Sequence, residues 1–207
     1  MSADPALDAG PEEIRAGRAI EPRPLAWWGM MLTLAVIATM YGAMYFSYFY
    51  IRIGVTRWPP DGIAPPALGL PAVSAAALLA SAIVLWGGLR RSHRGELGAE
   101  RFGLLSALVL AGASVALLLL DWTRAGFGVD VHSYAALYYV LPAIHAVVLA
   151  IGMLMAVVHL ALSFRPEDLP RRAVGLRALG AYWYLVALGG ALLTAVVYGT
   201  PHVWPVA

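Results

Sequence analysis

Five apolar stretches, each long enough to cross a lipid bilayer as a helix, leave this chain few possible folds. A membrane-spanning helix needs about 20 consecutive, mainly apolar residues. Hydrophobic residues make up 61% of the chain and charged residues only 13%, against roughly 25% charged residues in an ordinary soluble domain. The sequence therefore predicts an all-α, polytopic membrane bundle of five transmembrane helices, at residues 25–51, 67–89, 102–120, 134–164 and 178–198.

The residues before the first apolar stretch have a different composition. Residues 1–24 are acidic and rich in proline, and we expect them to form a disordered cytoplasmic tail. The transmembrane domain is expected to follow over residues 25–207. The first apolar stretch is too long for the apolar region of a cleaved signal peptide, so it is expected to act as an uncleaved insertion signal.

Arginine placement predicts how the helices are oriented, since every basic residue is Arg. Eleven arginines fall on the side of the N-terminal tail: Arg15, Arg18, Arg23, Arg90, Arg91, Arg94, Arg101, Arg165, Arg171, Arg172 and Arg177. Only Arg52, Arg57 and Arg124 fall on the other side. Cytoplasmic loops carry an excess of basic residues, so the N-terminus is predicted to be cytoplasmic and the C-terminus periplasmic. The net charge of +2 is too small to indicate nucleic acid as a partner.

Ionisable residues are almost absent from the centres of the apolar stretches. All twelve acidic residues fall in the tail, in loops or at helix ends, and the chain has no cysteine. Proton pumps and proton-coupled carriers usually hold carboxylates inside the membrane, so these classes are disfavoured. Asp121 comes closest, at the end of the third stretch, and is expected to be exposed. Iron-sulfur clusters and thiol catalysis are excluded.

Histidines provide the remaining candidates for cofactor or metal binding. His145 and His159 are fourteen residues apart on one stretch, about 21 Å along a helix, so one haem iron cannot be held by both. His145 is expected to be a packed histidine, bonded to a tyrosine or a backbone carbonyl, and His159 to be solvated. Asp130, His132 and His202 form only a weak metal hypothesis. We therefore assign no catalytic, cofactor-binding or metal-binding residue.

Small residues are concentrated on the first and last stretches. They are Ala35, Ala38, Gly42 and Ala43 on the first, and Gly180, Ala187, Gly189 and Gly190 on the last. Small side chains let helices approach closely, so these faces are predicted to pack on one another or on a partner. Tyr41 and Tyr45 are four residues apart on the same helix face. Their hydroxyls are expected either to bond lipid headgroups or partner backbone, or to pack within the bundle.

Five motifs occur in an order that resembles subunit III of the haem-copper oxidases. The segment GMM…MYGAMYFSYFYIRIGVTRWPPDG resembles the family's first conserved helix and loop, and LPAVSAAALLASA its next helix. Asp121-Trp122, SYAALYYVLPAIHAVVLAIG and AYWYLVALGGALLTAVVY follow in the family's order. The family-motif, packing and lipid-contact candidates are Gly29, Tyr41, Gly42, Tyr45, Arg52, Trp58, Pro59, Pro60, Ser81, Asp121, Tyr134, His145, Gly152, Tyr182 and Trp183. The resemblance covers about residues 27–200, and five spans match the short bacterial members.

The chain departs from the family at positions that usually ionise or hydrogen-bond. The family's Ser-Glu pair reads Val36 and Ile37, and the second His of its paired-His helix reads Val148. The His and Asp of its last helix read Tyr184 and Ala187. The scaffold is retained while the ionisable groups are lost.

The resemblance implies a divergent accessory subunit with no catalytic centre of its own. Haem and copper are then expected in partner subunits, with this chain packed on subunit I, near subunit II and further subunits, in the bacterial inner membrane. It implies bound phospholipid and support of assembly and proton uptake during aerobic electron transport. Alternatives are an equivalent subunit of a nitric oxide reductase or of another respiratory complex, a stand-alone small transporter and an oxidase assembly factor. The electron donor, cytochrome c or quinol, stays open.

Overall fold

The structure is a computed structural model that describes residues 25–60, 62–92, 94–164 and 169–203. Its helices are α2 (Leu25–Ile53), α3 (Gly69–Ser92), α4 (Leu97–Arg124), α5 (Ser133–Leu162) and α6 (Leu169–Thr194), and α6 continues through a π-helical turn, η3 (Ala195–Gly199), into α7 (Thr200–Val203). No strand is present among the described residues. The predicted all-α fold is therefore confirmed. The predicted tail, residues 1–24, lies outside the described residues.

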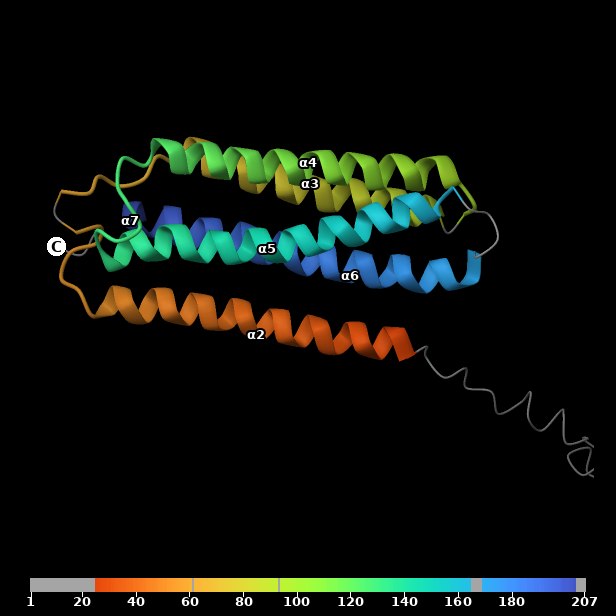
Figure 1. The fold of residues 1–207 in the computed structure, drawn as a ribbon, viewed down its shortest axis with the longest axis horizontal. Helices are drawn as coiled ribbons and strands as arrows, with labels where there is room; N and C mark the ends of the chain where they lie inside the picture. Colours follow the sequence, from red (N-terminus) through yellow and green to blue (C-terminus); the bar gives the residue numbers. More distant parts are fainter. Residues whose placement is uncertain (1–24, 61, 93, 165–168, 204–207) are drawn as a thin grey trace, which may run out of the picture.

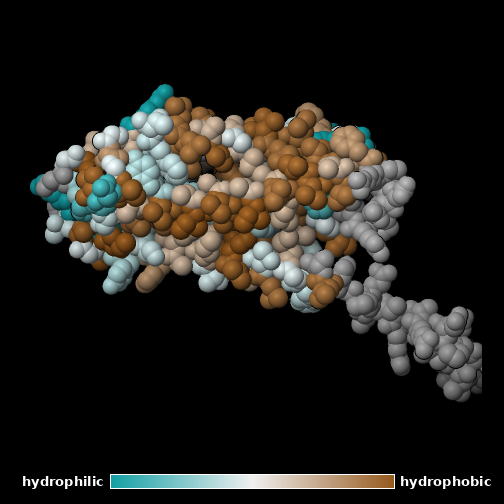
Figure 2. Space-filling model, in the orientation of Figure 1, coloured by the Kyte–Doolittle hydropathy of each residue, from teal (hydrophilic) through white to brown (hydrophobic). Residues whose placement is uncertain are grey.

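Five helical segments are long and apolar enough to cross a membrane, the last running from Ala173 to Val203. The chain is a multi-pass membrane protein. Figure 2 shows the matching surface, with hydrophobic atoms over the middle of the molecule and hydrophilic atoms gathered toward its two ends. That distribution is the one expected when the middle faces lipid and the ends face water.

The helices run up and down in alternating directions (Figure 1). One end of the bundle holds the α2–α3 and α4–α5 loops and α7, and we call it the Trp58 end. The other holds the start of α2 and the α3–α4 loop, and we call it the Arg101 end. In Figure 1 α3 and α4 form one side, α2 lies at the opposite edge, and α5 and α6 lie between them. Helix α6 contacts α2, α3 and α5.

Helix α4 extends beyond the predicted apolar stretch at both ends, because its polar residues have partners inside the protein. At the Arg101 end, Glu100 accepts a short hydrogen bond from Ser92. Arg101 donates to the Ser163 carbonyl at 2.7 Å and lies over the Phe164 ring. These contacts tie the first turns of α4 to the ends of α3 and α5. Hydropathy scores each charged residue as unfavourable in a membrane, whatever its partners. The predicted span therefore stops short of these residues.

A glycine pair brings the backbones of α3 and α4 into close contact. A Cβ atom at Gly88 would lie 2.8 Å from the Cα of Gly103, and a Cβ at Gly103 would lie equally close to Gly88. The two backbones therefore touch, and neither position has room for a side chain. This pair was not among the residues expected to pack closely, although two glycines in apolar helices are the sequence signal for such a contact.

Candidate functional site

A buried tyrosine–histidine contact links the edge helix α2 to the centre of the bundle. The Tyr41 hydroxyl lies 2.7 Å from Nδ1 of His145 on α5, and both side chains are buried. His145 is thus a packed histidine bonded to a tyrosine, as expected. A hydrogen bond in the interior resists exchange with water, so it fixes the depth of α2 relative to α5.

Two glycines of α6 make room for this contact. A Cβ atom at Gly189 would lie 2.6 Å from the Tyr41 ring, and one at Gly190 would collide with the His145 ring. Tyr45 donates a hydrogen bond of 2.8 Å to the Gly189 carbonyl. Close packing at the last helix is therefore confirmed for this pair. Of the two alternatives for Tyr41 and Tyr45, packing within the bundle is the one observed.

The small residues of α2 lie on a different face. Gly42 is exposed and has nothing within 4 Å of its Cβ position, and the same holds for Gly29. The remaining small residues, Ala35, Ala38 and Ala43, are exposed too. Of the two predicted contacts for this face, the one with another helix of the same chain is not observed among the described residues, because α2 turns Tyr41 and its neighbours one and two turns away inward instead. Contact with a partner stays a prediction.

Motif residues from three helices meet in a second buried cluster. Trp183 of α6 donates its indole N–H to the Ser81 hydroxyl of α3 at 2.9 Å. Its neighbour Tyr182 donates to the Val148 carbonyl of α5 at 2.7 Å. Gly152 lies beneath that ring, where a Cβ atom would be 2.8 Å from it. These residues are far apart in the sequence, and their contacts hold α3, α5 and α6 together.

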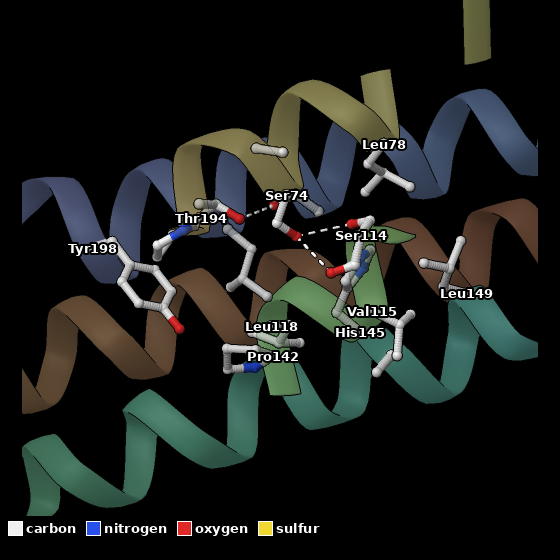
Figure 3. A pocket seen from close by; sticks show the side chains of 15 residues that line it. Ser74, Leu78, Ser114, Val115, Leu118, Pro142, His145, Leu149, Thr194 and Tyr198 are labelled. Carbon is white, nitrogen blue, oxygen red and sulfur yellow. Dashed lines mark hydrogen bonds between the residues drawn. The ribbon is translucent and has the colours of Figure 1, made fainter. Parts of the chain in front are cut away.

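A small cavity lies between α3, α4, α5 and α6 (Figure 3). Its volume is about 20 Å³, and its polar lining comes from Ser74, Ser114, His145 and Thr194. Ser74 donates to the Ser114 carbonyl and shares a second contact of 2.9 Å with its hydroxyl. Such a volume has room for one water molecule and for no larger ligand. The pairing of serines on different helices leaves no local pattern, so the sequence alone does not reveal this contact.

Two aromatic motif residues, Trp58 and Tyr134, meet at the Trp58 end. Trp58 donates its indole N–H to the Tyr48 hydroxyl at 2.9 Å, and that hydroxyl lies 2.6 Å from the Thr200 hydroxyl. Tyr134 packs edge-on against Trp58, with ring centroids 5.0 Å apart. The other motif residues of the α2–α3 segment are the buried Arg52 and the half-buried Pro59 and Pro60. The loop is therefore bound to the starts and ends of three helices.

Asp121 is buried, with 6% of its surface exposed, so its predicted exposure is wrong. Its carboxyl group accepts a short hydrogen bond from the Tyr138 hydroxyl of α5. The Tyr198 hydroxyl lies close by and is also buried. Asp121 is covered because α5 begins beside the last turn of α4, a neighbour that the sequence of α4 does not reveal.

The remaining histidines of the sequence analysis have protein contacts. His132 caps α5 by accepting from the backbone N–H of Tyr134, and His202 donates to the Pro66 carbonyl at 2.9 Å. His159, expected to be solvated, is half-buried against Gly175. Within residues 25–203 as described, no three His, Cys, Asp or Glu side chains group to hold a metal ion. The described residues therefore lend no support to the metal hypothesis for Asp130, His132 and His202.

Comparison with known proteins matches most of the chain to one kind of subunit. No protein-family model matches it. It is 25% identical over 180 residues to cytochrome c oxidase subunit 3 of Synechocystis sp., covering 84% of this chain and 75% of the relative. It is 22% identical over 175 residues to cytochrome c oxidase subunit 3 of Thermostichus vulcanus, covering 82% and 85%. The chain is a distant homologue of cytochrome c oxidase subunit 3.

The positions at which this subunit 3 homologue departs from the family pattern lie mostly in its core. Ile37, Val148 and Ala187 are all buried, whereas Val36 is exposed and Tyr184 half-buried. An ionisable side chain at a buried position needs a partner to offset its desolvation. Apolar side chains need none, and the Val148 backbone is already an acceptor for Tyr182. The losses noted in the sequence are therefore compatible with a fully packed bundle.

Proposed function

We propose that this chain is a non-catalytic accessory subunit of a haem-copper oxidase, packed on the haem-bearing subunit I in a bacterial inner membrane. The observation that carries the proposal is homology over 84% of the chain. The internal bonding of the motif residues supports it. Tyr41, His145, Ser81 and Trp183 bond to one another or to backbone in the core, where they hold helices in register.

Arginine placement on the fold supports an orientation with the N-terminus in the cytoplasm. Among the described residues, the Arg101 end carries Arg90, Arg91, Arg94, Arg101 and Arg177. The Trp58 end has Arg52, Arg57 and Arg124. By the excess of basic residues on the cytoplasmic side, the Arg101 end faces the cytoplasm and the Trp58 end the periplasm.

The outward face of α2 supports contact with subunit I and with phospholipid. Large apolar side chains are exposed every three or four residues in two runs on this helix: Leu25, Trp28, Leu32 and Val36 in the first, and Phe46, Tyr50 and Ile53 in the second. Gly42 and Ala43 lie on the exposed surface of the same helix and would let another helix approach closely. In this proposal, contacts made by this face of α2 support assembly of the complex. The assembled complex in turn supports proton delivery by the catalytic subunit.

The proposal is tested by purifying a tagged copy of the full chain from native membranes in mild detergent. We expect a large haem-bearing subunit in equal amount, identified by its mass and by a reduced-minus-oxidised spectrum. The haem type would separate oxygen chemistry from nitric oxide chemistry. A colourless chain that purifies alone, under conditions that preserve known respiratory complexes, would overturn the proposal and favour a stand-alone transporter. A haem subunit present only before the complex matures would favour an assembly factor.

A further inference from the structure

The small cavity between α3, α4, α5 and α6 receives one polar side chain from each of these helices (Figure 3). Ser74 comes from α3, Ser114 from α4, His145 from α5 and Thr194 from α6. The cavity volume is about 20 Å³, whereas one water molecule needs roughly 10–15 Å³. Which small molecule fits therefore depends on the hydrogen-bond donors and acceptors that these four side chains present.

The Tyr41 hydroxyl determines which nitrogen of His145 carries the proton. This hydroxyl has one proton and two acceptors within reach, Nδ1 of His145 at 2.7 Å and the Val186 carbonyl at 3.5 Å. The shorter contact is the stronger hydrogen bond, so Tyr41 donates to Nδ1. A neutral imidazole that accepts at Nδ1 carries its proton on Nε2.

The His145 ring is neutral and turns Nε2 toward the cavity. The residues that line the cavity include no carboxylate, and a buried imidazolium without an anionic partner would be costly. Nε2 lies against Gly190, another lining residue, where a Cβ atom would be 2.5 Å from it. Among the described residues Nε2 has no hydrogen-bond partner. The cavity wall therefore contains one N–H donor that needs an acceptor.

The hydroxyl groups of the wall have already used their protons. Thr194 donates to the Gly190 carbonyl at 3.0 Å, and Ser74 donates to the Ser114 carbonyl at 2.9 Å. Because the Ser74 proton is used there, Ser114 is the donor in the 2.9 Å contact between the two serine hydroxyls. The oxygens of Ser114 and Thr194 keep lone pairs and have no further proton to give. They act as acceptors toward the cavity.

One donor and two acceptors select the ligand. It has to accept a hydrogen bond from Nε2–H of His145 and donate one to each of two oxygens. Water does both, and the three bonds that result are the usual number for a buried water molecule. An ammonium ion could not accept from the N–H, and dioxygen could not donate to the oxygens.

We propose that this cavity is a binding site for one water molecule, which accepts from Nε2–H of His145 and donates to the hydroxyl oxygens of Ser114 and Thr194. The bound water extends the contact between Tyr41 and His145, which joins α2 to α5, as far as α4 and α6. Every polar side chain of the wall then has its partners, as buried polar groups generally do. The site concerns the chain by itself and is independent of the oxidase proposal.

The test is nuclear magnetic resonance of the full chain in detergent, labelled with ¹⁵N at histidine. The nitrogen chemical shifts report which ring nitrogen of His145 is protonated, and His145→Ala identifies the signal by its loss. We expect the proton on Nε2. We also expect a cross-peak between this proton and water, because the bound molecule lies within hydrogen-bond distance of it.

Two variants of the wall test the acceptors. Thr194→Val keeps the shape of the side chain but removes its oxygen, so the water cross-peak should weaken severalfold and the Nε2–H proton should shift upfield. Thr39→Val is the matched control, because the exposed Thr39 also donates to the carbonyl four residues earlier, at 2.9 Å. It should change neither signal. Ser114→Ala on a different helix is a second variant, with the same expectation as Thr194→Val, should that variant fail to fold.

Three results would overturn the proposal. A proton on Nδ1 would remove the donor from the cavity wall. A proton on Nε2 without a water cross-peak would mean that the N–H bonds directly to a protein oxygen. A cross-peak unchanged in both wall variants would place the water away from Ser114 and Thr194. A chain that shows the expected signals yet purifies without a haem subunit would refute the oxidase proposal alone.

Discussion

Helices α2 and α6 are both apolar spans with small residues, yet they lie in opposite environments. Over an 18-residue apolar stretch of α2 17% of the residues are buried, against 50% over a stretch of the same length in the last span. Helix α6 contacts three other helices, and its glycines receive the rings of Tyr41 and His145. Helix α2 turns one narrow stripe inward, Ile37, Tyr41, Met44 and Tyr48, and leaves its glycines outside. Glycine thus allows close packing within the chain on α6, whereas on α2 it lies on the exposed surface.

The largest effect is expected from filling the space at α6. Gly190→Leu would place a side chain against His145 and Leu78. Overpacking a core costs about 1–3 kcal/mol and occasionally more, and we expect about 3 kcal/mol here because the neighbouring rings are themselves fixed. Denaturant unfolding of the purified chain in detergent measures this loss in the free energy of unfolding. Unfolding as stable as that of the unchanged chain would show that α6 is not the tightly packed centre described above.

A smaller loss is expected from removing the bond that joins α2 to the centre. Tyr41→Phe leaves Nδ1 of the buried His145 without its partner, which costs about 1–3 kcal/mol. Tyr50→Phe is the matched control on the same helix, because Tyr50 is 70% exposed, and it should change stability little. Equal effects of the two substitutions in the unfolding measurement would mean that α2 is not anchored through Tyr41.

His145→Ala extends this test to function. We expect a similar loss of stability, of order 1–3 kcal/mol, because the Tyr41 hydroxyl loses its partner. In the proposed accessory role, initial electron-transfer rates of the purified complex should stay near normal and its haem spectrum unchanged. Loss of a haem band in this variant would refute an accessory role without a cofactor.

The contact between α3 and α6 should contribute less. Trp183→Phe removes the hydrogen bond to Ser81 but keeps most of the ring packing, so a loss of about 1 kcal/mol is expected. Ser81 still bonds to the Leu78 carbonyl, which limits the cost. Trp28→Phe at a largely exposed position is the control. If Trp183→Phe lowered the free energy of unfolding as much as Gly190→Leu, the contact between α3 and α6 would contribute more to stability than the contact with α2.

The smallest effect on the chain itself is expected at the exposed glycine of α2. Gly42→Leu meets open space, and exposed substitutions usually change stability by less than about 0.5 kcal/mol. In the proposed complex the same substitution should reduce the recovery of the haem-bearing subunit, because it blocks close approach of a partner helix. Destabilised unfolding of the isolated chain would instead place Gly42 in an internal contact. Unchanged stability with unchanged assembly would assign this face of α2 to lipid.

The number and approximate positions of the spans, the all-α class and the homology to subunit 3 follow from the amino-acid sequence alone. Hydropathy over about 20 residues is a local property, so it is read without knowing the neighbours. The motifs around Trp58, His145 and Trp183 are likewise short local runs of residues, so they and their order can be recognised without knowing the fold. The expectation that His145 is a packed histidine with a tyrosine or carbonyl partner was also correct, because a histidine alone in an apolar helix has few other stable states.

Which helix faces meet depends on the packing of the folded bundle. It brought Tyr41 to His145 over a separation of 104 residues, covered Asp121 with Tyr138, and placed Gly88 against Gly103. It also turned Gly42 outward. Within a membrane the whole circumference of a helix is apolar, so hydrophobic periodicity does not distinguish the lipid-facing side from the packed side. That choice depends on the shapes and polar partners of helices distant in sequence, which exist only once the bundle has formed.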